Sequence, residues 1–318
     1  MKKTALIAGV TGQDGAYLAH YLLSLGYTVY GTSRDAQMCD NSRLKSLGIE
    51  SGVKILSLAL NDFRSVLKVV SMVCPDEIYN LAGQTSVGLS FDQPVECMES
   101  ISVGTLNLLE VIRFLNAEIR FFNAGSTESF GQTGEKPVTE QSPLSPRSPY
   151  AVAKAAAYWQ VSTYREAYNL FACTGILANH ESPLRPMRFV TQKIISGVRN
   201  IKEGKQKNLN LGNLDIYRDW GWAPDYVQAM NMMLQSESPV DYLIASGTTT
   251  PLRTFVELAF EIAELNIDQF LVLSDDLKRP ADLNYSAVNP CFISEQLGWS
   301  SKRSVREIVQ KMYFDEIF

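Results

Sequence analysis

The first 180 residues alternate short apolar runs with longer amphipathic stretches. The apolar runs are rich in β-branched or aromatic residues and are bounded by Gly, Pro, Asp or Asn, a pattern that predicts strands. The predicted strands are 4–8, 28–32, 53–58, 77–81, 120–124 and 171–178. Helical periodicity between them predicts helices at 13–25, 63–73, 95–116 and 149–168. Such alternation is typical of βαβ units, in which helices cover both faces of a parallel sheet.

The pattern becomes less regular after residue 180. It predicts helices at 189–203, 224–235, 252–265 and 305–313, and one more strand at 242–245. The chain therefore predicts an α/β fold, a Rossmann-like doubly wound parallel sheet with a smaller, interleaved C-terminal lobe for the substrate. We expect the Rossmann domain to span 1–180 with a returning segment of about 213–246, and the second lobe to comprise 181–212 and 247–318.

Composition and charge narrow the choice of partner and compartment. The chain has 318 residues, with 29 Lys+Arg against 34 Asp+Glu and a formal net charge of −5. Nucleic-acid backbones are bound by clustered cations, so we expect no nucleic-acid partner. No stretch approaches the roughly 20 apolar residues of a bilayer span, so no membrane association is expected. The apolar run at 5–10 leads directly into a glycine motif, which favours a buried first strand over a signal peptide, and we expect a cytoplasmic protein.

The cysteines and histidines argue against several kinds of site. The five cysteines stand at 39, 74, 97, 173 and 291, without a C-x-x-C pair, so neither a disulfide framework nor a zinc ribbon is expected. The two histidines are His20, on a predicted helix, and His180, in a predicted loop. An imidazole metal site is therefore not expected. A serine triad is not expected either, because the G-x-S-x-G elbow is absent.

A glycine motif joins the first predicted strand to the first helix. Gly9, Gly12 and Gly15 form a G-x-x-G-x-x-G pattern. Glycines allow a tight turn and a close approach of the backbone to a pyrophosphate, and the helix N-terminus supplies amide donors. The motif therefore predicts a dinucleotide site. The residues of this loop expected to contact the cofactor are Gly9, Thr11, Gly12, Gln13, Asp14 and Gly15.

The end of the second strand bears on which dinucleotide binds. Arg34 follows this strand, and Arg43 comes later in the same loop. An arginine at this place suits a ribose 2′-phosphate, whereas an acidic residue suits a 2′-hydroxyl. We therefore expect NADP, while Asp35 beside Arg34 keeps NAD as the alternative.

Four side chains predict a catalytic group. Ser126 and Glu128 follow the fifth strand, at the sheet edge where α/β proteins bind ligands. Tyr150 and Lys154 are four residues apart on a predicted helix, so they share one face. A tyrosine titrates near 10, and a lysine ammonium one turn away favours the phenolate. We therefore expect a lowered pKa for Tyr150, which would let it take a hydroxyl proton while a hydride leaves the same carbon.

Cations gather in the second lobe of this acidic chain, after Asn179-His180-Glu181-Ser182-Pro183. Several placed cations in one lobe indicate an anionic ligand such as a diphosphate. The residues concerned are Arg185, Arg188, Lys193, Arg218 and Arg279.

The chain resembles the extended short-chain dehydrogenase/reductases that act on nucleotide sugars, and within them the GDP-mannose 4,6-dehydratase family. The resemblance runs nearly from end to end. The stretches that carry it are T-G-Q-D-G-A-Y-L-A (11–19), N-L-A-G-Q-T-S-V-G-L-S-F-D-Q-P (80–94), P-R-S-P-Y-A-V-A-K (146–154), Y-R-E-A-Y-N-L-F-A (164–172), N-H-E-S-P-L-R (179–185) and R-D-W-G (218–221).

This resemblance implies a redox-neutral dehydration of a GDP-sugar. Tyr150 would take the C4 hydroxyl proton as a hydride passes to NADP, while Ser126 hydrogen-bonds the C4 oxygen. Glu128 would then remove the C5 proton as water leaves C6, and return of the hydride to C6 would yield a 4-keto-6-deoxy sugar. A simple dehydrogenase has no need of a second base, so Glu128 is the residue that favours elimination.

The resemblance also implies binding residues and an assembly. The further cofactor residues would be Leu60, Leu81, Ala82, Gln84, Tyr150, Lys154, His180 and Arg185. The GDP-sugar residues would be Ser86, Ser90, Asn179, Val190, Lys193, Arg218, Arg279 and Asp282. A homodimer or homotetramer without a metal is expected.

The chain departs from the family pattern at several positions. Ser126-Thr127-Glu128 stands where the family has T-S-E, and Ala59 replaces an adenine-contacting Asp. Glu96 stands in place of a tyrosine beside the cofactor, and Met187 and Arg188 replace acidic or smaller residues beside the sugar.

These departures leave the exact reaction open at this point. Both GDP-mannose and a GDP-manno-heptose remain candidate substrates. A 4-ketosugar reductase or a 4-epimerase on the same fold is the alternative, and a non-catalytic nucleotide-binding regulator is a third interpretation.

Overall fold

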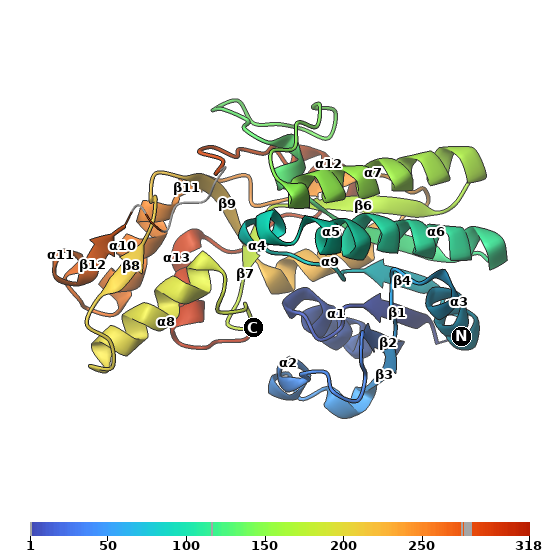
Figure 1. The fold of residues 1–318 in the computed structure, drawn as a ribbon, viewed down its shortest axis with the longest axis horizontal. Coiled ribbons are helices and arrows are strands. Elements are labelled where there is room, and N and C mark those ends of the chain that lie inside the picture. The colour runs from blue at the N-terminus through green and yellow to red at the C-terminus, as the bar shows by residue number, and fades with distance from the viewer. Residues whose placement is uncertain (1, 116, 275, 277–281) are drawn as a thin grey trace.

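The computed structural model describes residues 2–115, 117–274, 276 and 282–318. Within these residues, seven strands form one parallel sheet in the order β10-β6-β5-β4-β1-β2-β3 (Figure 1). Their bounds are β1 (Thr4–Ala8), β2 (Thr28–Ser33), β3 (Val53–Ser57), β4 (Glu77–Asn80), β5 (Arg120–Ser126), β6 (Ala172–Leu177) and β10 (Tyr242–Ile244). The chain leaves β1 in one direction toward β3 and in the other toward β10, which confirms the predicted doubly wound α/β fold.

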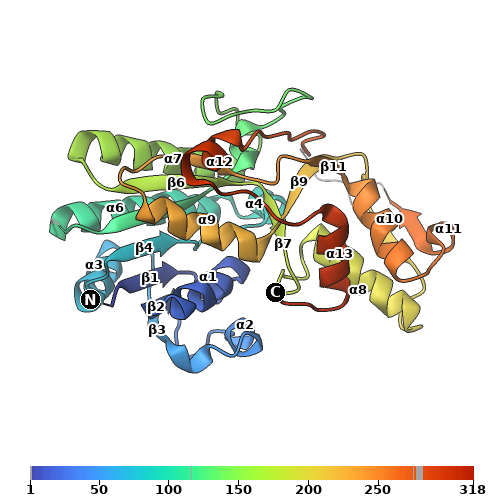
Figure 2. The same cartoon turned by 180° about the vertical axis from the view of Figure 1, so that it is seen from behind.

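Helices cover both faces of this sheet (Figures 1 and 2). One face carries α1 and α9, whereas the other carries α3, α6 and α7. The helices of these layers are α1 (Gln13–Ser24), α2 (Ser42–Ser46), α3 (Phe63–Val73), α6 (Gly104–Leu115), α7 (Pro149–Tyr168), α9 (Ala223–Gln235) and α12 (Cys291–Leu297). Because both faces are covered, strands such as β4 and β6 are buried along their whole length.

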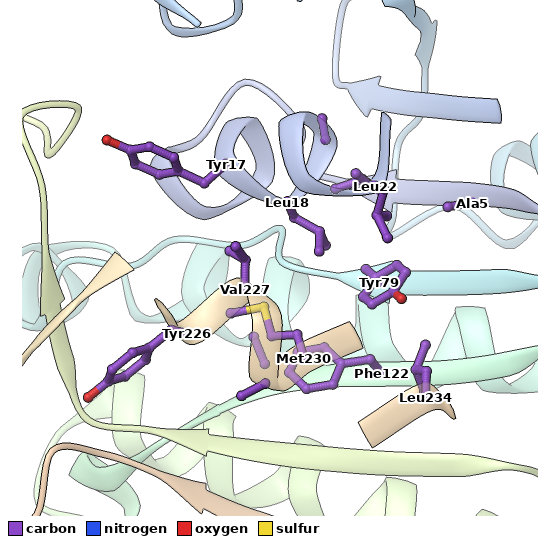
Figure 3. Packing of buried hydrophobic residues seen from close by; sticks show 14 of the residues in the cluster. Ala5, Tyr17, Leu18, Leu22, Tyr79, Phe122, Tyr226, Val227, Met230 and Leu234 are labelled. Atoms are coloured by element: carbon purple, nitrogen blue, oxygen red, sulfur yellow. The ribbon is translucent and has the colours of Figure 1, made fainter. Parts of the chain in front are cut away.

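Helix α9, which belongs to the returning segment of about 213–246, packs with α1 on one face of the sheet. Leu18 and Leu22 of α1 and Val227 and Met230 of α9 converge on strand side chains such as Phe122 (Figure 3). These side chains are fully or almost fully buried. Residues more than 200 positions apart therefore share one apolar layer, which packs α1 against the sheet.

The second lobe has a core of its own. Its elements are α8 (Val190–Lys202), β8 (Leu209–Leu211), α10 (Leu252–Ile262), α11 (Ile267–Phe270), β12 (Leu271–Leu273) and α13 (Val305–Tyr313). Trp220, Trp222 and Phe255 are among the largest buried side chains there. A small sheet in the order β11-β9-β7 connects the two parts, with bounds β7 (Asn179–Glu181), β9 (Tyr217–Trp222) and β11 (Thr249–Pro251). None of the helices in the described ranges is long and apolar enough to cross a bilayer.

One prediction about local structure is confirmed with a difference, and another is wrong. The stretch expected to form a single helix at 95–116 is helical throughout its described residues, but a π-helical turn η2 (Glu99–Val103) separates α5 (Pro94–Met98) from α6. Ser100 Oγ and Thr105 Oγ1 donate to the carbonyls four residues earlier, and such side-chain bonds compete with regular helix geometry. His180 lies in strand β7 and not in a loop, because its backbone pairs with β9. The sequence pattern also missed the short α4 (Val87–Asp92), η1 (Glu50–Gly52) and η3 (Thr127–Phe130).

Candidate active site

A cleft of about 800 Å³ opens at the carboxyl ends of the strands. It lies where the sheet order reverses between β1 and β4, which is where open α/β sheets bind ligands. Most residues predicted to bind the cofactor line it: Gly9, Thr11, Gly12, Gln13, Asp14, Gly15, Arg34, Leu60, Leu81, Ala82, Gln84 and Arg185. Arg43, Tyr150, Lys154 and His180 do not line it.

The glycine loop forms the floor of this cleft at the start of α1. Gly9 has a φ of +83°, and a Cβ there would lie 3.0 Å from the Cα of Ala82. A Cβ on Gly15 would lie 2.3 Å from the Gly9 carbonyl oxygen. The loop therefore folds this tightly only without side chains, and its backbone amides at the helix start suit a pyrophosphate. The residues present thus fit a dinucleotide.

His180 supports the glycine loop from behind. Its Nε2 lies 2.9 Å from Asp14 Oδ2, its Nδ1 lies 2.7 Å from the Ala178 carbonyl oxygen, and its ring stacks on Tyr226. Burial alone would raise the pKa of Asp14, but the attraction and hydrogen bond of His180 lower it to about 2. Burial alone would lower the pKa of His180, but Asp14 raises it above its usual value. His180 therefore positions the loop through Asp14.

The two arginines considered for the ribose phosphate occupy different places. Arg34 lines the cleft with a side chain that is 87% exposed, and its Nη1 lies 3.3 Å from Glu96 Oε1. Arg43 is half-buried and donates to the carbonyl oxygens of Thr11 and Leu184, at 3.1 and 2.8 Å. Arg34 is thus available to a ligand in the cleft, whereas Arg43 ties the glycine loop to the second lobe.

The predicted catalytic residues converge at the end of β5. Ser126 is the last residue of β5, and its Oγ accepts the backbone N–H of Glu128 at 3.3 Å. Glu128 lies in η3, with its Oε1 3.7 Å from Nε of Arg218 on β9. Tyr150 and Lys154 lie one turn apart on α7, and both are buried.

The expected lowering of the Tyr150 pKa by Lys154 is wrong for the protein by itself. Burial raises the pKa of Tyr150 to about 12, against a smaller opposite effect of the Ser126 hydroxyl. Burial also lowers the pKa of Lys154 to about 8. Lys154 Nζ donates to the Ala124 carbonyl oxygen at 2.6 Å and lies 5.9 Å from the centre of the Tyr150 ring. Desolvation therefore outweighs the attraction between the ammonium and a phenolate.

The residues predicted to bind the GDP-sugar are spread along the junction of the two lobes. Arg218 is buried, and its Nη2 lies 3.4 Å from Asp282 Oδ1, so these two residues and Glu128 form one charged cluster. Ser86 caps α4, while the Ser90 hydroxyl donates to the Val87 carbonyl oxygen. The remaining members are Asn179 on β7 with Val190 and the exposed Lys193 on α8. Arg279 lies outside the described residues.

The structure adds residues to the cleft that the sequence did not assign to a site. Thr85, Glu99 and Phe189 line it, as does Glu96, which the sequence marks only as a departure from a family pattern. Arg188, one of the cations expected to indicate an anionic ligand, lines the cleft as well. Arg188 Nη2 donates to Thr85 Oγ1 at 3.1 Å across the cleft. Thr85 follows the end of β4, which was the sequence signal for it, whereas Glu96 and Glu99 lie in the helical stretch after α4 and had no such signal. No group of three or more His, Cys, Asp or Glu side chains that could hold a metal ion occurs among the residues described.

The fold is shared with solved structures of other proteins. UDP-glucose 4-epimerase of Thermus thermophilus, in complex with NAD, superposes with a TM-score of 0.86 at 23% identity over 98% of each chain. dTDP-glucose 4,6-dehydratase of Bacillus anthracis str. Ames, also with NAD, gives 0.84 at 20% identity, covering 99% of this chain and 97% of that one. RMD from Pseudomonas aeruginosa, with NADPH, gives 0.82 at 23% identity over 99% and 98%. These likenesses show the fold.

Similarity in sequence extends over the same length. A family model described as GDP-mannose 4,6 dehydratase matches residues 6–312. The GDP-mannose 4,6-dehydratase of Sinorhizobium fredii (strain HH103) is 42% identical over 99% of this chain and 97% of that protein. That of Vibrio cholerae is 39% identical over 100% of this chain and 94% of the relative. The chain therefore belongs to the GDP-mannose 4,6-dehydratase family.

Proposed function

We propose that this protein is an NADP-dependent hydro-lyase that converts GDP-mannose, or a GDP-manno-heptose, to the 4-keto-6-deoxy sugar. The observation that carries this proposal is the position of Glu128, whose carboxylate follows Ser126 at the end of β5 and contacts Arg218. A reductase or an epimerase acts at C4 and needs no base for C5. A carboxylate in this position therefore favours elimination over both alternatives.

Each catalytic side chain has one task in the proposed sequence. When bound, the nicotinamide ring supplies reversible hydride acceptance and, in its oxidised form, a positive charge. Tyr150 takes the proton of the C4 hydroxyl, and the Ser126 hydroxyl hydrogen-bonds the C4 oxygen. Glu128 removes the C5 proton, which the C4 ketone acidifies, and passes this proton to the hydroxide that leaves C6, so that water departs.

The high pKa of Tyr150 limits when this residue can act as a base in the proposed reaction. With its pKa raised to about 12 by burial, the phenol is protonated at neutral pH in the protein by itself. It becomes a competent base only when positive charge or new hydrogen bonds lower its pKa. We therefore propose that Tyr150 acts after the cofactor and the sugar have both bound.

The two parts of the chain would bind different ligands. We propose that residues 1–180, with the returning segment of about 213–246, bind NADP, and that 181–212 and 247–318 bind the GDP-sugar. Gly9, Gly15 and the start of α1 would hold the pyrophosphate, and Arg34 would meet the 2′-phosphate. Arg218, although it belongs to the returning segment, would bind the nucleotide diphosphate and would also stay in contact with Glu128.

Exposed apolar side chains support the assembly of this protein into a homo-oligomer. Val103, Val152 and Trp159 are large apolar side chains exposed on η2 and α7, beside α6. We propose that this surface pairs with a second copy in a homodimer or homotetramer, which light scattering during gel filtration would reveal.

We also propose a cytoplasmic location, since all five cysteines are unpaired thiols.

The test of the reaction is direct. Purified protein is incubated with NADP and either GDP-mannose or GDP-manno-heptose, and the 4-keto product is followed by its absorbance in alkali. We expect product from one of the two sugars without net consumption of NADPH. Failure with both sugars would refute the proposed reaction, and steady consumption of NADPH would indicate a reductase.

A further inference from the structure

One end of the cleft contains an ion pair that lies where the cofactor's ribose is expected. Arg34 follows β2, and Glu96 lies in α5, yet their Nη1 and Oε1 atoms are 3.3 Å apart. Both side chains line the cleft, with exposed fractions of 87% and 45%. In Rossmann folds the residue after the second strand contacts the ribose 2′ group, and an arginine there suits a 2′-phosphate. Glu96 therefore places a negative charge beside the group that would receive this phosphate.

Neighbouring charged residues do not relieve this conflict. Asp35 turns into its own loop, where Oδ1 accepts the backbone N–H groups of Gln37 and Met38. Arg43 does not line the cleft and donates to the backbone carbonyls of Thr11 and Leu184. Glu99 lines the same cleft and adds a second carboxylate. Arg34 thus contacts the carboxylate of Glu96 in α5, and Glu99 of η2 adds negative charge to the same cleft.

The backbone holds Glu96 in this position. Ser100 Oγ donates to the Glu96 carbonyl oxygen at 2.7 Å and accepts the backbone N–H of Gln84 at 3.1 Å. The next residue, Cys97, is fully buried against Tyr150 and its neighbours. Helix α5 is therefore fixed to the loop that follows β4, and the Glu96 carboxylate stays within a side chain's reach of Arg34.

We propose that Glu96 is a specificity-determining residue that restrains the preference for NADP over NAD. Its carboxylate competes with a 2′-phosphate for Arg34 and repels the phosphate dianion, whereas the neutral 2′-hydroxyl of NAD meets no such repulsion. The preference for NADP over NAD is then smaller than Arg34 without Glu96 would give. This inference rests on the proposed function, because it requires a nicotinamide dinucleotide in the cleft.

The test compares the binding of NADPH and NADH by cofactor fluorescence and calorimetry, without any sugar. Glu96→Gln should tighten NADPH binding about fivefold to tenfold and leave NADH binding within about twofold, the size expected for one exposed charge near a dianion. The gain should shrink at about 500 mM salt relative to about 50 mM. Asp92→Asn, which removes a charge from the exposed end of α4 outside the cleft lining, is the matched control and should change neither affinity.

The possible outcomes distinguish a failure of this inference from a failure of the proposed function. Equal effects of Glu96→Gln on both nucleotides, or no effect on NADPH, would overturn the role of Glu96 and leave the dehydratase proposal standing. Arg34→Gln should weaken NADPH binding alone, and an equal loss for NADH would also overturn the role. A wild-type protein that binds neither nucleotide would refute both proposals.

Discussion

Arg218 Nε lies 3.7 Å from Glu128 Oε1, although 90 positions separate these residues in the chain. Arg218 belongs to β9, which connects the two lobes, and its guanidinium is almost completely buried. A buried charge is costly unless it is paired, so the Arg218 guanidinium favours the position of Glu128 that keeps this contact. The orientation of the proposed C5 base is therefore set by β9 of the connecting sheet as well as by η3, which carries Glu128.

Replacing the proposed base should separate the two halves of the reaction. Glu128→Gln keeps the side-chain volume and removes the carboxylate, so we expect C4 oxidation, seen as reduced nicotinamide in a single turnover. Formation of the dehydrated product should fall at least about 100-fold, measured by its absorbance in alkali. Glu135→Gln, at an exposed position, is the control and should leave both steps unchanged. Normal dehydration by Glu128→Gln would show that the base is another residue.

Lys154 should give the stability of the protein a distinctive dependence on pH. Burial lowers its pKa in the folded state to about 8, below the value near 10.5 of an unfolded chain. Between these values the unfolded state binds more protons, so the free energy of unfolding rises with pH. From about pH 7 to about pH 9.5 the wild type should gain about 2 kcal/mol relative to Lys154→Met, measured by urea denaturation. A constant difference would contradict the lowered pKa.

The pair of Asp14 and His180 should stabilise the protein in a limited pH window. The pKa of Asp14 is lowered to about 2, so its contribution is present above about 3.8 and is lost as the pH falls toward 2. The pKa of His180 is raised, so its contribution is present below about 6.5 and is lost at higher pH. Asp14→Asn should therefore reduce the free energy of unfolding most near pH 5, by about 1–3 kcal/mol. An equal loss at pH 5 and near pH 2.5 would contradict this pairing.

The glycine loop should tolerate no side chain at its third glycine. A Cβ at Gly15 would lie 2.3 Å from the Gly9 carbonyl oxygen, so the loop must open to admit it. Gly15→Ala should weaken the binding of NADP at least about tenfold, measured by calorimetry, because the backbone amides then leave the pyrophosphate position. Gly88→Ala is a suitable control, since a Cβ there meets no atom within 4 Å. Unchanged binding by Gly15→Ala would place the cofactor elsewhere.

The hydrophobic pattern of the sequence predicted the elements of the main sheet well and the short elements around it less well. Strand β1 and helices α3, α7 and α13 have the predicted bounds, because apolar periodicity is a property of the segment itself. The helix expected at 95–116 is interrupted by η2, where hydroxyl groups bond to backbone carbonyls. Strands β7, β9 and β11 were missed, because such short strands are defined by their partners more than by their own residues.

The amino-acid sequence by itself determined the alternating α/β architecture, the glycine loop, and the location of Ser126 and Glu128 after a strand with Tyr150 and Lys154 on one helix face. These features depend on spacing along the chain, which a sequence displays directly. Only the tertiary structure decided that Arg218 contacts Glu128, that His180 supports the glycine loop through Asp14, and that the phenol of Tyr150 is stabilised in its protonated form. These features depend on which distant residues meet and on how far water is excluded, and both are set by packing.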